Sequence, residues 1–301
     1  MNYTFKVPEK KKLRLIINTD AKNEADDQYA IVHALLTPKF IIKSIMAAHF
    51  GTRRTQYSME ESYAEINNVL SLMDMEGRVY VSRGAKHALM DENTPVVSEG
   101  AQFIVDEAMK DDPLPLFVIF LGPLTDMACA YLLQPAIAEK LTVIWIGGGV
   151  WPEGCMEFNL SNDIHAANVV FKSNIPLWQV PMDVYSMMRI SLAELQLKVS
   201  PYGKIGRYLF EQLVEVNEAW GEISWWPAGE SWSLGDSPTI GLLLEQTGYE
   251  YEEKEAPCFT MDMKYIHGCG NRKIRVYNTI NTRFIFEDFF AKLELNYPTH
   301  K

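Results

Sequence analysis

The sequence predicts an α/β protein with a mainly parallel central sheet flanked by helices and a helix-rich C-terminal part. Two observations predict this class. Apolar runs alternate with segments of helical periodicity from residue 13 to about residue 181, and such alternation is typical of right-handed crossovers in a parallel sheet. Beyond about residue 185 the pattern becomes more helical. Because the sequence has no repeat, low-complexity tract or linker, residues 1–301 are expected to form one domain.

Six apolar runs are expected to form the strands, because strands buried on both faces read as continuous apolar segments. LRLIIN at 13–18 is the first of them, and PLFVIFLG at 115–122 is the clearest. The other four lie at 40–48, 78–82, 141–149 and 175–181.

Helices are expected between these strands, where apolar residues recur every three or four positions. In the first, from Asp26 to Leu36, one face carries Ala30, Ile31, Ala34 and Leu35. The others are expected at 57–74, 98–110, 124–133 and 163–173. Nearer the C-terminus, residues 220–236 hold four tryptophans and read as a long irregular loop.

The composition excludes several classes of protein. With 28 Lys and Arg against 39 Asp and Glu, the formal charge of −11 argues against a nucleic acid as the main partner. The four cysteines form no CxxC pair, which argues against a zinc knuckle or a disulfide framework. No apolar stretch resembles a signal peptide or reaches the length of a membrane span. We therefore expect a cytoplasmic protein with no membrane partner.

An acidic segment follows the first predicted strand. Asp20, Glu24, Asp26 and Asp27 occupy four of eight consecutive positions. Like charges this close resist ionising together, so a compensating cation is expected nearby. Asp26 and Asp27 alone have an equally good explanation, because aspartate caps a helix and favours the positive end of its dipole. Asp20 together with both of them favours a functional site.

Other polar clusters are predicted at the same edge of the sheet. Asp20, the GPLTD segment at 122–126 and the three glycines at 147–149 each follow a predicted strand, and ligands of such sheets collect at the carboxyl ends of the strands. Calcium takes six to eight oxygen ligands. Asp20 and Asp27 could reach one such ion, with Asp236 and a carbonyl near Thr125 completing the cage.

Six motifs stand out along the chain: TDAKNEADDQYAIVHALL, GPLTDMACAYLLQP, IWIGGG, MEFNLSNDIHAANVVF, IPLWQVPMDV and LGDSPTIGLLL. In this order and at similar separations, they resemble the motifs of the inosine-uridine-preferring nucleoside hydrolases. The resemblance covers nearly the whole chain from residue 13 on. It implies a nucleoside hydrolase-like domain, a small nucleoside-like substrate and a homo-oligomer, either a dimer or a tetramer.

The resemblance also implies roles for individual residues. One Ca²⁺ would be held by the carboxylates of Asp20, Asp27 and Asp236 and by a backbone carbonyl from Thr125. Asp20 matches the general base, which takes a proton from a calcium-bound water. The ribose hydroxyls would be bound by Asp26 and Asn159, and the 5′ hydroxyl by Glu157.

The sequence departs from the family pattern at three places. Five residues, Ala21 to Ala25, separate Asp20 from Asp26 instead of the usual three, and Glu24 within this longer loop is expected to face solvent. Gly235 stands where many members have a leaving-group histidine, and His49, His165 and His267 are weak substitutes. The asparagine that helps bind the 5′ hydroxyl has no clear counterpart.

The leading prediction is an N-glycosyl hydrolase of ribonucleosides or a related N-riboside. Trp225, Trp226 and Trp232 are candidates for stacking on a purine, which would ease its departure without an acid. Packing against a neighbouring helix or subunit is at least as good an explanation for any one of them. One alternative is a degenerate homologue that binds calcium and a ribosyl ligand without turnover. A phosphotransferase of the haloacid dehalogenase type is disfavoured, because residue 22 is lysine where that class needs a second aspartate.

Overall fold

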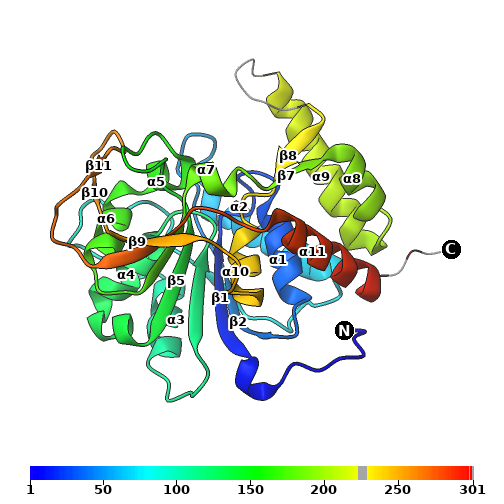
Figure 1. Ribbon diagram of the computed structural model, residues 1–301, viewed down its shortest axis with the longest axis horizontal. Coiled ribbons are helices and arrows are strands. Elements are labelled where there is room, and N and C mark those ends of the chain that lie inside the picture. Colours follow the sequence, from blue (N-terminus) through cyan, green and yellow to red (C-terminus); the bar gives the residue numbers. More distant parts are fainter. Residues whose placement is uncertain (223–228, 298, 300–301) are drawn as a thin grey trace.

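The computed structural model describes residues 1–222, 229–297 and 299. Its main sheet has eight strands in the order β3-β2-β1-β4-β5-β6-β12-β9 (Figure 1). All neighbouring strands pair in parallel except β12 and β9, which are antiparallel. The strands are β1 (Leu13–Thr19), β2 (Phe40–Ala47), β3 (Val81–Arg83), β4 (Leu116–Phe120), β5 (Leu141–Ile146), β6 (Leu177–Val180), β9 (Tyr251–Glu255) and β12 (Lys273–Tyr277). The predicted fold class is confirmed.

The middle of the sheet is buried on both faces. Every residue of β1 and of β4 is buried, which explains why both strands read as continuous apolar runs. Side chains alternate between two hydrophobic clusters: Leu15 and Ile17 belong to one, and Ile16 to the other. β1 and β4 pair although about 100 residues separate them. The order of the strands reverses at this pair, and the carboxyl ends of strands at such a point form a ligand crevice.

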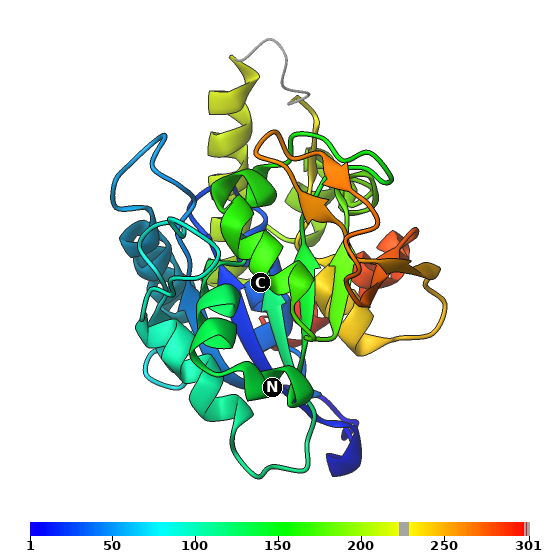
Figure 2. The same ribbon diagram turned by 90° about the vertical axis from the view of Figure 1, so that its left-hand side faces the viewer.

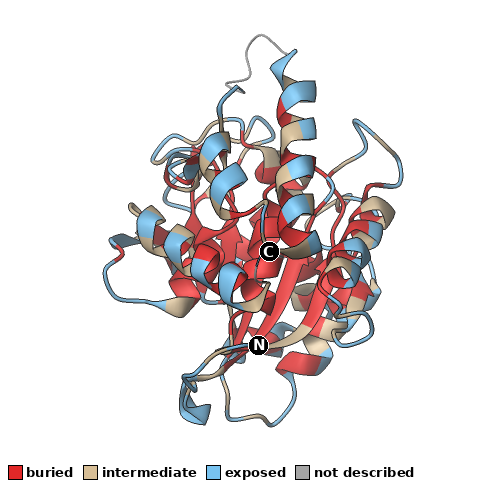
Figure 3. Cartoon of the chain, turned by 90° about the vertical axis from the view of Figure 1, so that its right-hand side faces the viewer, coloured by how far each residue is buried: buried red, intermediate tan, exposed pale blue. Residues whose placement is uncertain are grey.

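Helices cover both faces of the sheet, and the buried residues of sheet and helices form a continuous interior (Figure 3). The cluster around Leu15 includes residues of α1 (Asp27–Leu35), α2 (Ser58–Leu72), α9 (Gly203–Gly221), α10 (Pro238–Leu244) and α11 (Thr282–Asn296). The cluster around Ile16 includes residues of α3 (Glu99–Ala108), α4 (Thr125–Leu133) and α6 (Ile164–Lys172). Five of them, α1, α2, α3, α4 and α6, lie within two residues of the helices expected from the sequence.

The C-terminal third holds more strand than the sequence predicts. β9 and β12 join the main sheet, and two small antiparallel sheets pair β7 (Arg189–Ser191) with β8 (Ser231–Ser233) and β10 (Cys258–Phe259) with β11 (Tyr265–Ile266). The expected loop at 220–236 therefore contains the end of α9 and strand β8. The far end of α9 projects beyond the sheet (Figure 2).

Short elements complete the chain: η1 (Glu9–Lys11), η2 (Pro135–Glu139), α5 (Phe158–Asn162), α7 (Met182–Tyr185) and α8 (Leu192–Lys198). Within the described ranges, no helix is long and apolar enough to cross a bilayer.

Candidate functional site

A cavity lies at the carboxyl ends of the central strands. Asp20 follows β1, Leu121 follows β4 and Ile146 ends β5, and all three line it. Six carboxylates line the same cavity: Asp20, Glu24, Asp26, Asp27, Glu157 and Asp236. This is the sheet edge at which the sequence predicts a site.

Three of these carboxylates form a compact cluster. Oxygens of Asp26, Asp27 and Asp236 lie within 4.8 Å of one another, and all three residues are buried. Asp26 and Asp27 stand at the start of α1, whereas Asp236 comes from the loop before α10. The hydroxyl of Thr19 donates to Asp27. Such a set of carboxylate oxygens suits a hard divalent cation.

Asp20 lines the cavity beside this cluster and is only 2% exposed. Its Oδ2 is buried and has no hydrogen-bond partner among the described residues. The backbone at Gly122 passes close to the same carboxylate, because a Cβ at that position would lie 2.5 Å from Asp20 Oδ1. A buried carboxylate oxygen without a donor is costly, so this atom is suited to a cation or a ligand.

The electrostatics of the cavity favour a positive partner. Burial, followed by the charge of Asp27, raises the pKa of Asp20 well above its ordinary value. Burial and then Asp26 do the same for the pKa of Asp236. Burial raises the pKa of Asp27 to about 6, although hydrogen bonds from Thr19 and Asp236 oppose the shift. Too little positive charge lies near these carboxylates for all of them to ionise together, and a divalent cation would supply that charge.

The longer acidic loop folds inward, so the expectation that Glu24 faces solvent is wrong. Glu24 lines the cavity, and burial together with Asp27 raises its pKa to about 7. Three side chains from outside the loop hold its backbone: Gln28 donates to the carbonyl of Ala21, Gln212 to that of Ala25, and Arg54 to that of Asn23.

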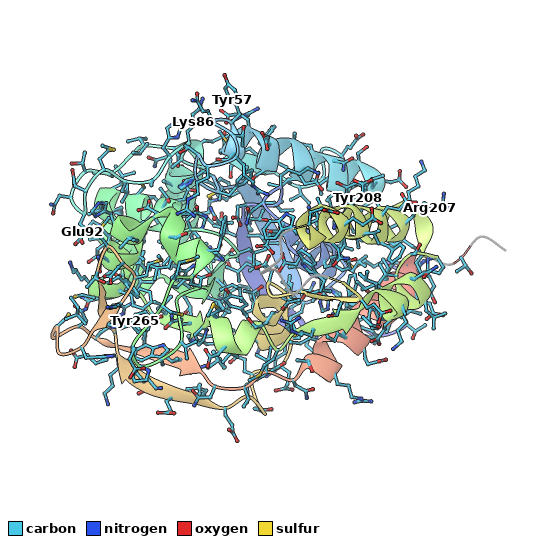
Figure 4. All side chains as sticks on the ribbon, turned by 90° about the horizontal axis from the view of Figure 1, so that it is seen from above. Tyr57, Lys86, Glu92, Arg207, Tyr208 and Tyr265 are labelled. Atoms are coloured by element: carbon cyan, nitrogen blue, oxygen red, sulfur yellow. The ribbon has the colours of Figure 1, made fainter. Side chains whose placement is uncertain are left out.

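Glu65 of α2 stabilises the inward position of the acidic loop. Its carboxylate accepts hydrogen bonds from Gln28 and from Tyr208 of α9 (Figure 4) and forms an ion pair with Lys22. The loop thus depends on two helices that are remote from it in the sequence.

Asn159 and Glu157 reach the cavity from the start of α5. The side-chain amide of Asn159 donates to the carbonyls of Leu121 and Ile146 at 2.6 and 2.9 Å, which uses both of its N–H groups and leaves Oδ1 as an acceptor. Glu157 caps α5 by accepting hydrogen bonds from the backbone N–H groups of Asn159 and Leu160. Burial raises its pKa, and these donors oppose the shift.

The structure does not bring Thr125 to the cavity. Its hydroxyl donates to Asp163 and contacts His49 Nε2. Because Thr125 is the first residue of α4, its carbonyl is in place to accept a hydrogen bond within that helix. Leu121, four residues earlier, lines the cavity instead. The expected carbonyl from Thr125 is therefore contradicted by this geometry, and Leu121 is the nearer candidate.

The remaining expectations have mixed outcomes. Trp225 and Trp226 lie outside the described residues. No histidine, lysine, arginine or cysteine of the described ranges lines the cavity, and His49 is buried against Thr125 instead. Sequence reasoning missed Tyr185, which lines the cavity at the end of α7. Its position shortly after the strand at 175–181 was the only available signal.

Comparisons with known proteins agree with this architecture. The chain is 26% identical over 260 residues to the pyrimidine-specific ribonucleoside hydrolase RihA of Salmonella enteritidis, covering 77% of this chain and 80% of that protein. Among solved structures, the purine-preferring ribonucleoside hydrolase of Gardnerella vaginalis superposes with a TM-score of 0.78 at 18% identity, covering 94% of this chain and 99% of that one. The plant nucleoside hydrolase PpNRh1 superposes with a TM-score of 0.76 at 18% identity, covering 93% and 98%.

The structural neighbours share the fold, and the family model for inosine-uridine preferring nucleoside hydrolases matches residues 15–271, a span that contains every described residue of the acidic cavity. The chain belongs to this family and is an N-glycosyl hydrolase.

Proposed function

We propose that this protein is a calcium-dependent hydrolase that cleaves the N-glycosidic bond of ribonucleosides. The observation that carries the proposal is the cavity at the ends of β1, β4 and β5. There, beside the cluster of Asp26, Asp27 and Asp236, Asp20 presents a carboxylate oxygen that has no hydrogen-bond partner among the residues the structure describes. The names of RihA and of the Gardnerella vaginalis enzyme, both ribonucleoside hydrolases, support the same reaction.

The residues present fit a calcium ion. Asp20, Asp27 and Asp236 would supply carboxylate oxygens, and Leu121 would supply its carbonyl, which accepts one hydrogen bond from Asn159 and keeps a second lone pair. When bound, such an ion lowers the pKa of an adjacent water and fixes its position. Its charge also keeps the neighbouring carboxylates ionised.

Side chains of the protein would accept the proton of the attacking water and bind the ribose. Asp20 would accept the proton of the attacking water at Oδ2 and so act as general base. Asp26 and the Oδ1 of Asn159 would accept hydrogen bonds from the secondary hydroxyls of the ribose. Positive charge builds on the sugar as the glycosidic bond breaks, and the surrounding carboxylates would stabilise that charge.

The leaving base would depart without the histidine that many members of the family have before the late aspartate, because Gly235 stands there. No histidine lines the cavity in the described ranges. Stacking by Trp225 and Trp226 on a purine remains our proposal for this end of the substrate. One relative is named pyrimidine-specific and one neighbour purine-preferring, so the assay must include both kinds of base.

The test is release of reducing sugar from inosine, guanosine, adenosine, uridine and cytidine, before and after chelation. We expect activity on at least one of them, lost with chelator and restored by calcium. Asp20→Asn should lower kcat by about 10²- to 10⁴-fold, the usual contribution of a general base. Asp106→Asn, on the exposed face of α3, is the control and should keep full activity. Calcium binding without sugar release from any of these nucleosides would contradict the proposal.

A further inference from the structure

Tyr185 lines the cavity but has no role in the function proposed above. Its hydroxyl donates to Glu157 Oε1 at 3.0 Å. Its ring borders Gly235, because a Cβ on that glycine would lie 3.0 Å from Tyr185 Cδ2. The tyrosine therefore spans the wall between Glu157 and the residue that precedes Asp236.

The hydrogen bonds of Glu157 decide which residue can meet a ligand here. Its Oε1 accepts from the N–H of Asn159 at 3.1 Å and from Tyr185, and its Oε2 accepts from the N–H groups of Gly148 and Leu160 at 2.8 and 2.9 Å. A carboxylate offers about four lone-pair sites, and four donors fill them. Glu157 thus has no free acceptor for a hydroxyl of the substrate.

The hydroxyl oxygen of Tyr185, in contrast, keeps acceptor capacity after donating its one hydrogen. Burial, followed by the charge of Glu157, raises the pKa of Tyr185 well above its ordinary value, so the phenol keeps its proton and remains a donor to Glu157. The ring of Tyr185 lies beside Asp26, because the same added Cβ on Gly235 would be 3.5 Å from Asp26 Oδ2, and its hydroxyl reaches Glu157. A ribose whose secondary hydroxyls bind Asp26 and Asn159 has its primary hydroxyl left to meet the hydroxyl of Tyr185.

We propose that Tyr185, not Glu157, accepts the hydrogen bond of the sugar's primary hydroxyl, that Glu157 fixes the orientation of Tyr185, and that residue 235 is glycine because the ring of Tyr185 needs that space. This inference rests on the proposed function, since it assigns one end of the same substrate.

Tyr185→Phe keeps the ring and removes the acceptor. We expect kcat/KM for uridine and inosine to fall about tenfold, mainly through KM, because one neutral hydrogen bond is lost. For 5′-deoxyuridine and 5′-deoxyinosine the variant should equal the wild type. Tyr80→Phe removes a similar tyrosine–carboxylate hydrogen bond, to Glu99 on the surface, and should change neither.

Gly235→Ala provides a second test that keeps the hydroxyl. The added methyl group would push the ring of Tyr185 by a few tenths of an ångström, so the same selective loss is expected for substrates with a 5′ hydroxyl. Equal losses on the parent and 5′-deoxy substrates would overturn the inference.

A wild type inactive on all nucleosides would instead contradict the proposed function. Calorimetry with D-ribose and 5-deoxy-D-ribose, in the presence of calcium, would then still test the role of Tyr185. Tighter binding of D-ribose by the wild type, but not by Tyr185→Phe, supports the assignment, and equal binding of both sugars by the wild type overturns it.

Discussion

Gly122 offers a sharp test of the geometry around Asp20. An alanine methyl group there would lie 2.5 Å from Asp20 Oδ1, 2.7 Å from its Cγ and 3.1 Å from its Cβ, whereas ordinary contact begins at 3.4 Å. Gly122 has no positive φ, so its backbone conformation itself accepts alanine. The carboxylate of Asp20 or the 122–126 turn must therefore move by about 0.9 Å at the closest contact.

The expected cost follows from that displacement. A shift of about 1 Å in a catalytic group costs roughly 100-fold in rate, so kcat/KM of Gly122→Ala should fall about 100-fold, equivalent to about 2.7 kcal/mol. Overpacking should also lower the free energy of unfolding by about 1–3 kcal/mol. Sugar-release kinetics and urea unfolding measure the two effects.

Gly221→Ala is the matched control. This glycine ends α9, has no positive φ, and an added Cβ would meet nothing within 4 Å. Its activity should be unchanged and its stability within about 0.5 kcal/mol of the wild type. A Gly122→Ala variant with wild-type kinetics and calcium affinity would refute the assigned position of Asp20.

Three further predictions concern pH and stability. Without a cation, the pKa of Asp27 is raised to about 6 and that of Glu24 to about 7, so protons compete with calcium for these carboxylates. The rise in Tm on adding calcium should therefore be larger at pH 8 than at pH 5.5. Equal rises at the two pH values would contradict this competition. Glu65→Ala removes an acceptor of the Gln28 side-chain amide and should lower the free energy of unfolding, measured in urea, by about 1–3 kcal/mol. A decrease of less than about 0.5 kcal/mol would show that Glu65 does not hold the loop. Burial lowers the pKa of His33 to about 4, below its ordinary 6.5, so the neutral imidazole contributes stability above pH 6.5 and this contribution is lost as the pH falls toward 4. In His33→Gln the stability lost on acidification should therefore be smaller by up to about 3 kcal/mol. A pH profile of unfolding identical to that of the wild type would contradict this role of His33.

The parallel part of the fold was predictable because its strands are buried on both faces. β1, β4 and β5 carry few polar residues, so their sequences can be read locally. β9 was missed for the opposite reason: YEEKE is mostly exposed at the edge of the sheet and carries charges. β12 is short and polar at its start, and only its pairing with β6 and β9 identifies it as part of the sheet.

The candidate site was predictable wherever a residue directly follows a strand, as Asp20 does. Glu24 could not be placed, because its inward position depends on contacts of the loop with Gln212 and Arg54, which lie far away in the sequence. The choice between Thr125 and Leu121 depends on which of these residues lines the cavity, and the local pattern does not show this even though it locates α4 to within one residue.

Calcium titration of the chelator-treated protein tests the central claim most directly, with ion binding by calorimetry and sugar release from the best nucleoside followed on the same samples. We predict one tight site per chain and activity that rises in proportion to its occupancy, with Asp236→Asn weakening both together. Full activity without any bound ion, or no calcium binding at all, would contradict the account.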